Sequence, residues 1–180
     1  MIHRSMPTLI VFAAMIIFNM GAGTFSQASA ADQVLRSGDW SVFCDDKKKQ
    51  SKDSCYLSYV QKLKDKKTGN VVGTTISVFV RANRGSATKT INITGPLGID
   101  LTQGIIVGID EKNRQSLKVN QCTKAGCAAA ANADEAFVDL MKAGKALSVY
   151  VLPFGAAKAV KFEASLSGFT KAVNTINSMK

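Results

Sequence analysis

Alternation of apolar and polar side chains predicts a series of short β-strands along most of the chain. In residues 38–46, Trp40, Val42 and Cys44 fall on one face, as alternate positions of a strand do. Other segments are predicted to be strands by the same alternation or by their β-branched residues, and Gly, Asn and charged residues separate them. The predicted strands span residues 38–46, 55–64, 71–83, 86–94, 105–110, 115–122, 146–153 and 158–167.

Two segments have the spacing of amphipathic helices instead. Residues 130–144 repeat apolar side chains on one face and reach Gly144, a residue type that is common just after a helix. Residues 168–179 show a shorter stripe of the same kind, and residues 95–104 are predicted to be irregular, with an open role. Because no βαβ alternation occurs, we predict a mainly β fold: a single-domain, immunoglobulin-like β-sandwich with one to two short helices.

The N-terminus has the features of a secretory signal peptide. A short positive start precedes an apolar core, and small residues at Ala28–Ser29–Ala30 suit signal peptidase, which predicts cleavage before Ala31. Residues 1–30 would then be the signal peptide and residues 31–180 the folded domain, located in the periplasm, secreted or held at the cell envelope. An uncleaved membrane anchor is the alternative, since residues 5–31 carry no charge.

The four cysteines follow this segment, at Cys44, Cys55, Cys122 and Cys127. Paired cysteines normally form disulfides in an exported protein, and the spacing favours two local bridges, Cys44–Cys55 and Cys122–Cys127. The second bridge would pin a turn between a strand and a helix. A four-thiolate zinc site is the alternative, although structural zinc ligands usually lie closer together in sequence. A redox C-x-x-C pair is absent from the sequence.

The chemistry available to an enzyme here is narrow. The single histidine, His3, lies in the predicted signal peptide, which excludes a Ser-His-Asp or Cys-His site from the mature domain. Asp45, Asp46 and Asp53 could in principle ligate calcium, but they flank a lysine run that repels cations. Lysine-assisted serine chemistry stays open without a feature that points to it. We therefore expect no enzyme, no cofactor and no metal.

Lysine clusters are the main candidates for a binding function, in a chain of formal net charge +10. Such clusters could bind anionic surfaces. Because consecutive hairpin turns lie at opposite ends of their shared strand, about 33 Å apart for ten residues, we expect two separate poles. Nucleic acid binding is disfavoured, since no aromatic residues interleave with the lysines. The clusters are Lys47, Lys48, Lys49 and Lys52 in the first turn, and Lys62, Lys64, Lys66 and Lys67 in the second.

An ordered set of short motifs resembles the invasion-associated locus B family of exported proteobacterial proteins. The resemblance extends over nearly all of residues 31–180 and implies a small exported β-sandwich with locally paired cysteines. It also implies a link to host-cell entry, and it carries no catalytic residue. The motifs are "GDWSVFC" (38–44) with a cysteine eleven residues later, "PLGIDLTQGI" (96–105), "QCTKAGC" (121–127) before an alanine-rich stretch, and "SLSGFTKA" (165–172).

These observations together predict a non-enzymatic binding protein of the cell envelope. Its expected partners are anionic components of the envelope or of a host surface, and the resemblance implies a contribution to host-cell interaction or invasion. A periplasmic structural or chaperone-like protein that binds other envelope proteins is the alternative. An exposed apolar face or an open sheet edge would favour that alternative. No small-molecule substrate is evident from the sequence.

Overall fold

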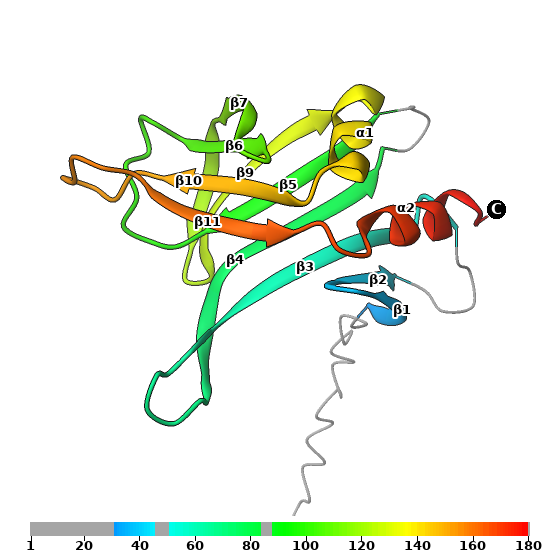
Figure 1. The fold of residues 1–180 in the computed structure, drawn as a ribbon, viewed down its shortest axis with the longest axis horizontal. Helices are drawn as coiled ribbons and strands as arrows, with labels where there is room; N and C mark the ends of the chain where they lie inside the picture. Colours follow the sequence, from blue (N-terminus) through cyan, green and yellow to red (C-terminus); the bar gives the residue numbers. More distant parts are fainter. Residues whose placement is uncertain (1–30, 46–50, 84–87, 180) are drawn as a thin grey trace, which may run out of the picture.

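The computed structural model describes residues 31–45, 51–83 and 88–179 of the chain. Two antiparallel sheets and two helices make up these residues (Figure 1). In chain order the elements are β1 (Asp32–Ser37), β2 (Trp40–Cys44), β3 (Cys55–Lys64), β4 (Val71–Ala82), β5 (Lys89–Gly95), β6 (Ile105–Ile109), β7 (Lys112–Leu117), β8 (Val119–Thr123), β9 (Gly126–Ala133), α1 (Glu135–Ala143), β10 (Ala146–Val151), β11 (Val160–Ser165) and α2 (Phe169–Asn177).

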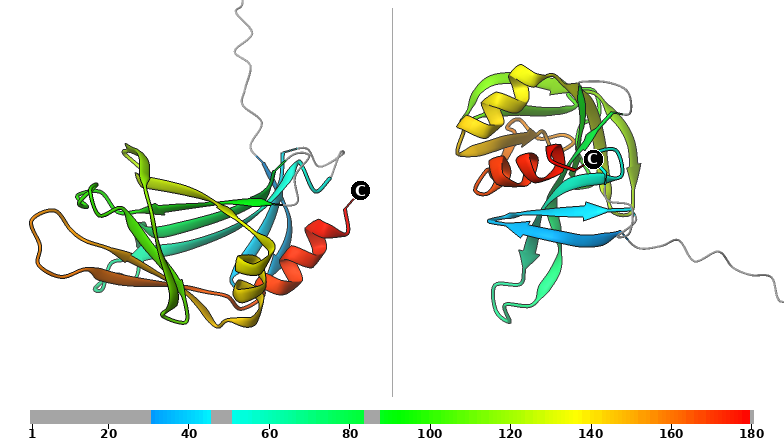
Figure 2. Two further views of the ribbon diagram at one scale, coloured as in Figure 1. Left: turned by 90° about the horizontal axis from the view of Figure 1, so that it is seen from above. Right: turned by 90° about the vertical axis from the view of Figure 1, so that its right-hand side faces the viewer.

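The strands divide into a sheet of seven and a sheet of four. The larger sheet has the order β1-β2-β3-β4-β5-β9-β8, so its first five strands form a meander. The smaller sheet has the order β11-β10-β6-β7 and lies across the larger one. Figure 2 shows both helices at one end of the two sheets and the β3–β4 and β10–β11 hairpin loops at the other. The predicted mainly β sandwich with two short helices and two local disulfides is confirmed.

Alternate side chains of both sheets form the core between them. Trp40 and Val42 of the larger sheet are fully buried, as are Val107 of β6 and Val149 of β10 in the smaller sheet. This period of two is what places one apolar face of each sheet against the other. Each such aliphatic or aromatic side chain contributes about 1.5–3 kcal/mol when it is fully buried.

The segment predicted as one strand over residues 115–122 is two strands in different sheets. β7 ends at Leu117, which is buried and pairs with Ile105 of the smaller sheet. β8 begins at Val119 and pairs with Ala129 of β9 in the larger sheet. The chain changes sheets at Lys118, where the alternation of residue types gives no signal because the backbone stays extended on both sides.

The helix predicted to begin at residue 130 begins at Glu135 instead. Residues 130–133 belong to β9, which pairs along its length with β5. Alanine favours helices, but here its small side chain fits beside β5, and pairing in the sheet overrides the local preference. Asp134 then caps the helix, since its carboxylate accepts a hydrogen bond of 2.8 Å from the Phe137 N–H.

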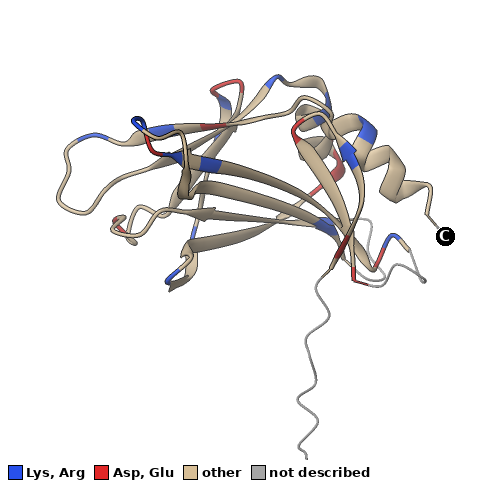
Figure 3. Ribbon diagram, turned by 90° about the horizontal axis from the view of Figure 1, so that it is seen from below, with Lys and Arg blue, Asp and Glu red and all other residues tan. Residues whose placement is uncertain are grey.

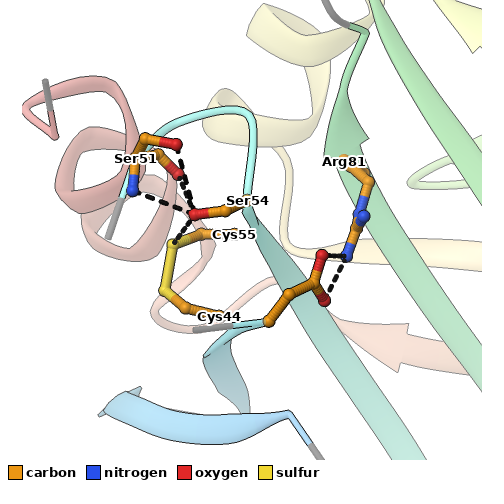
Figure 4. Close-up of polar contacts among 6 residues, drawn as sticks. Cys44, Ser51, Ser54, Cys55 and Arg81 are labelled. Atoms are coloured by element: carbon orange, nitrogen blue, oxygen red, sulfur yellow. Dashed lines mark hydrogen bonds and ion pairs between the residues drawn. A yellow bond between two sulfur atoms is a disulfide. The ribbon is translucent and has the colours of Figure 1, made fainter. Parts of the chain in front are cut away.

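Both disulfides join directly paired residues of neighbouring strands. Cys44 of β2 pairs with Cys55 of β3, and both side chains are fully buried at the end of that hairpin next to its connecting loop (Figure 4). Cys122 pairs with Cys127 across the β8–β9 turn. The second bridge therefore pins a β-hairpin rather than the predicted strand-to-helix turn, because the following alanines continue as a strand.

The first and last of the sequence motifs meet in space beneath α2. The Trp40 indole N–H donates a hydrogen bond of 2.8 Å to the Ser165 carbonyl, and the Asp39 N–H donates one of 3.1 Å to the Ser167 carbonyl. The Phe169 ring contacts the Trp40 ring edge to face, with centroids 4.9 Å apart. These contacts fasten α2 over β1 and β2, so one end of the chain closes the core formed by the other.

Candidate functional site

The β3–β4 hairpin extends beyond its neighbours and forms a projecting arm, defined here as residues 60–76 (Figure 1). Ser77 of β4 pairs with Thr94, next to the last residue of β5, so residues 71–76 have no partner in β5. At about 3.3 Å per residue, this stretch projects about 20 Å. Four exposed lysines lie on the arm: Lys62, Lys64, Lys66 and Lys67.

Asp65 fixes the turn at the end of this arm. Its carboxylate accepts hydrogen bonds from the backbone N–H groups of Thr68, at 2.7 Å, and Lys67, at 3.0 Å, and from the Thr68 hydroxyl at 2.9 Å. These bonds, led by the Thr68 N–H, lower the pKa of Asp65. The acid in the middle of the lysine cluster thus organises the turn, and the lysine side chains remain exposed around it.

A groove lies in the angle between the base of the arm and the β1–β2 hairpin. Its volume is about 540 Å³. Arg36, Lys62 and Lys64 bring positive charge to the groove, and Asp39 is the one carboxylate along it. The groove is lined by Gln33, Arg36, Asp39, Ser41, Phe43, Ser58, Tyr59, Val60, Gln61, Lys62 and Lys64.

Arg36 is the groove residue that the sequence analysis missed, because β1 was not predicted. The available signal was Gly38, which has a positive φ of 57° and turns the chain between β1 and β2. A glycine turn between two apolar stretches is typical of a hairpin. Recognising it would have placed Arg36 opposite Ser41, on the face that carries Phe43.

The described lysines of the two predicted clusters lie at opposite ends of β3. Lys52 lies just before β3, and the lysines of the arm lie at and beyond the other end of that ten-residue strand. Lys47, Lys48 and Lys49 fall outside the described residues. Lys62 and Lys64 of the second cluster line a groove with Arg36, whereas the first cluster contributes Lys52 alone to the described surface. Anion binding by either cluster stays a prediction.

The outer face of the larger sheet carries a strip of aromatic side chains. The rings of Phe43 and Tyr56 stack with centroids 5.7 Å apart, and Phe79 meets Tyr56 edge to face. The Arg81 guanidinium lies 5.0 Å from the Tyr56 ring centroid and pairs with Asp45 at 2.9 Å (Figure 4). The Asp45 carboxylate, which the sequence analysis considered as a calcium ligand, is therefore already paired with Arg81.

The other carboxylates give no support to a metal site. Asp46 lies outside the described residues, and Asp53 lies in the turn before β3. Across residues 31–45, 51–83 and 88–179, no group of three or more His, Cys, Asp or Glu side chains could hold a metal ion.

Serine–lysine chemistry has one structural candidate, and its electrostatics are unfavourable. Within the described ranges, the buried Ser148 hydroxyl has no hydrogen-bond partner, and Lys161 lies on the adjacent strand β11. Hydrogen bonds to Glu111 and Glu163 raise the pKa of Lys161. A general base must be neutral to accept a proton, so this lysine is poorly suited to activate a serine.

The stretch from Gly95 to Gly104, whose role the sequence left open, is an ordered loop. The Asp100 carboxylate accepts hydrogen bonds from the Thr102 hydroxyl, at 2.6 Å, and the Thr102 N–H, at 2.9 Å. The Asp100 N–H in turn donates to the Leu152 carbonyl at 2.7 Å, which ties this loop to the β10–β11 connection. The two loops are therefore held together at the end of the sandwich away from the helices.

Replacing Asp100 with alanine should loosen this loop without unfolding the domain. We expect backbone amides of residues 97–104 to exchange with deuterium several-fold faster, because Thr102 loses both of its bonds to the carboxylate. Hydrogen–deuterium exchange with mass spectrometry measures this directly. Asp139→Ala is the control, since Asp139 pairs only on the surface with Lys142 at 2.7 Å. Equal exchange in both variants would show that Asp100 does not order the loop.

The same hydrogen bonds between Asp100 and Thr102 determine the pH range over which the loop stays ordered. The Thr102 hydroxyl, followed by the Thr102 N–H, lowers the pKa of Asp100 from its ordinary value of 3.8. A lowered pKa means that the contribution of the carboxylate is complete above pH 3.8 and is lost as the pH falls through the lowered value. Protection of the loop should therefore be unchanged between pH 7 and pH 5, once intrinsic exchange rates are taken into account.

No helix in the described part of the chain is both long and apolar enough to cross a membrane. The fold and its described surface define a small, disulfide-bonded β-sandwich that carries loops, a basic arm and a basic groove. The family model described as "Invasion associated locus B (IalB) protein" matches residues 40–177, and the chain belongs to this family.

Similar proteins agree with this membership. Invasion protein B homologs of two Brucella abortus strains, 2308 and 9-941, are each 26% identical over 141 residues, which is 78% of this chain and 77% of theirs. The crystal structure of invasion associated protein b from Bartonella henselae matches with a TM-score of 0.64 and 23% identity, over 83% of this chain and 97% of that chain. This likeness establishes the shared fold.

Proposed function

We propose that this chain is an exported, non-enzymatic protein of the cell envelope that acts by binding anionic surfaces. The observation that carries the proposal is the joining of the arm and the groove into one basic region. Arg36, Lys62, Lys64, Lys66 and Lys67 contribute five positive charges there, against the carboxylates of Asp39 and Asp65.

The spacing of these charges suits a surface better than a small ion. Alternate residues of a strand lie about 6.6 Å apart, within the Debye length of about 8 Å at physiological salt, so neighbouring lysines act together on an extended anion. All four lysines of the arm are exposed, and two of them, Lys62 and Lys64, line the groove beside it. Basic side chains on a projecting element reach a charged surface ahead of the rest of the domain.

The names of the relatives suggest where such binding would be used. The Brucella relatives are called invasion protein B homologs, and the Bartonella protein an invasion associated protein. For this chain, we propose a contribution to host-cell interaction through the anionic surface of its own envelope or of a host cell. Export through the predicted signal peptide would bring the domain to either surface.

Charge reversal on the arm tests the proposal. We expect Lys62→Glu/Lys64→Glu to weaken binding to vesicles that contain anionic lipid by about 30-fold or more, because each basic residue near such a surface contributes about 1 kcal/mol. Binding is measured by co-sedimentation at low salt, alongside retention on a sulfated polysaccharide column. The matched control is Lys145→Glu/Lys171→Glu, which changes the net charge equally with two exposed lysines beside the helices.

The outcomes separate three readings. A large loss for the arm variant and a small loss for the control support the arm as the binding element. Equal losses would mean that only the net charge matters. If the wild-type protein binds neither the anionic vesicles nor the polysaccharide at low salt, the proposed function is wrong.

A further inference from the structure

Three large apolar side chains are exposed together at the end of the sandwich that lies away from the helices. Phe154, in the β10–β11 connection, is 83% exposed, and Leu97 and Leu101, in the β5–β6 loop, are each 56% exposed. Phe154 is the most exposed large hydrophobic side chain among the described residues. Leu97, Leu101 and Phe154 are called the apolar tip below.

The backbone holds the apolar tip in place. The Phe154 N–H donates a hydrogen bond of 2.8 Å to the Gly98 carbonyl, and Ile99 forms an isolated β-bridge with Pro153. Ile99 itself is only 5% exposed, so it anchors the loop in the core while Leu97 and Leu101 on either side point outward. Two loops that are hydrogen-bonded to each other thus present the three side chains, which stay exposed and do not pack on the core.

The connection that carries Phe154 is apolar beyond this one residue. Residues 154–160 read "FGAAKAV", and every one of them is exposed. Lys158 is the single charged residue in this segment. A water-exposed turn of a soluble domain normally carries several polar residues. This composition is unusual for a turn that is in contact with water alone.

Three lysines lie around the apolar tip, whose own loop carries one carboxylate, Asp100, bonded to Thr102. Lys118 follows Leu117, which pairs with Ile105 where the β5–β6 loop ends, and Lys124 lies in the turn of the β8–β9 hairpin, next to Gly95. Both lysines are exposed, as is Lys158. The arm projects from the same end of the molecule in Figures 1 and 2, and Figure 3 shows basic segments on the loops there.

We propose that this end of the protein docks on a bilayer containing anionic lipids, with the apolar tip inserted into the boundary between headgroups and acyl chains. The lysines of the arm, together with Lys118, Lys124 and Lys158, would contact the lipid phosphates. This inference rests on the proposed anionic-surface binding and identifies the surface as a membrane. Apolar side chains flanked by basic residues are the combination that holds proteins at such interfaces.

The shape of this end favours a bilayer over a protein partner. The tip and the arm are separate convex projections, which can enter a fluid headgroup layer independently. A stable protein interface needs about 800 Å² of complementary surface on each partner. The hollows beside the arm and on the aromatic strip lie on the outer face of the larger sheet, and a third, lined in part by Tyr150 and Ala159, lies on the smaller sheet. The side chains of the apolar tip line none of these three hollows.

Tryptophan fluorescence provides the most direct test of insertion. The only native tryptophan, Trp40, is fully buried and serves as a constant background. In Phe154→Trp, we expect a blue shift of the emission on adding anionic vesicles, and quenching when the vesicles contain lipids brominated near the headgroup. Leu140→Trp is the control, because Leu140 is 40% exposed on α1 at the opposite end. Its emission should not respond.

A second pair of variants separates this inference from the proposed function. We expect Leu97→Ser/Phe154→Ser to reduce vesicle affinity about tenfold or more, and Leu140→Ser to leave it unchanged. Retention on the sulfated polysaccharide should be the same for both. If the wild type and Phe154→Trp bind vesicles while the new tryptophan of this variant stays quenched by aqueous iodide and unaffected by brominated lipid, insertion is wrong and anionic-surface binding stands. If the wild type binds neither vesicles nor polysaccharide, both are wrong.

Discussion

Replacing Gly168 with alanine is expected to destabilise the folded domain by about 2–5 kcal/mol. Gly168 has a φ of 85°, a left-handed conformation that disfavours any residue with a Cβ. A Cβ at this position would also overlap the backbone carbonyl oxygen of Ser37, which cannot move without separating β1 from β2. The strain falls where the first and last motifs meet and where α2 is fastened.

Gly155→Ala is the matched control for this prediction. Gly155 has a similar φ of 74°, but no atom lies within 4 Å of the position that its added Cβ would take. It should therefore show only the conformational cost, about 1–2 kcal/mol. Urea denaturation measures both variants. Similar free energies of unfolding for the two would mean that the contact between Gly168 and Ser37 has no role in stability.

Removing the buried disulfide by Cys44→Ala/Cys55→Ala should lower the free energy of unfolding by about 3–5 kcal/mol. The bridge closes a separation of 11 residues, for which the chain-entropy estimate alone is about 3 kcal/mol. Both side chains are fully buried, so their loss also leaves a cavity next to the core. The thermal midpoint should fall by many degrees in calorimetry of the purified protein.

The second disulfide gives an internal comparison. Cys122–Cys127 closes a separation of only 5 residues, and Cys122 is exposed. We expect Cys122→Ala/Cys127→Ala to lower the free energy of unfolding by about 2 kcal/mol, without the added cost of a large cavity. A larger loss for this variant than for Cys44→Ala/Cys55→Ala would contradict the assignment of the first bridge to the core.

The parts of the fold that the sequence predicted are those in which local pattern and burial agree. Trp40, Val42 and Cys44 alternate in sequence and are buried in the structure, because one face of β2 lies on the core. The same holds for Phe169 and Val173 on the buried stripe of α2. In such elements the spacing of apolar residues along the sequence equals the spacing of the side chains that contact the core.

The errors arise where tertiary pairing decides the structure. Residues 130–133 are alanine-rich and helix-compatible, yet pairing with β5 makes them part of a strand. Around Lys118 the chain leaves one sheet and joins another while its backbone stays extended. The local alternation of apolar and polar residues does not indicate this change. β1 was missed because its outward face is largely polar and its partner lies across a single tight turn.

The candidate surfaces were only partly predictable for a related reason. Lys62, Lys64, Lys66 and Lys67 were identified from composition, and the structure adds that they lie on a projecting arm. Arg36 joins them through the pairing of β1 with β2, which the sequence analysis missed because it did not recognise the turn at Gly38. Phe154 and Leu97 lie 57 residues apart, and their loops are brought together by backbone contacts such as the hydrogen bond from the Phe154 N–H to the Gly98 carbonyl.

Binding of the exported wild-type protein to vesicles, measured across a range of salt concentrations, is the most direct test of its proposed role. Vesicles with anionic lipid and vesicles of purely zwitterionic lipid are compared at equal lipid concentration. We predict binding to the anionic vesicles alone at low salt, with an affinity that falls as the salt concentration rises. Equal binding to both kinds of vesicle at low salt, or binding to neither, would contradict the proposal that this protein acts at anionic membrane surfaces.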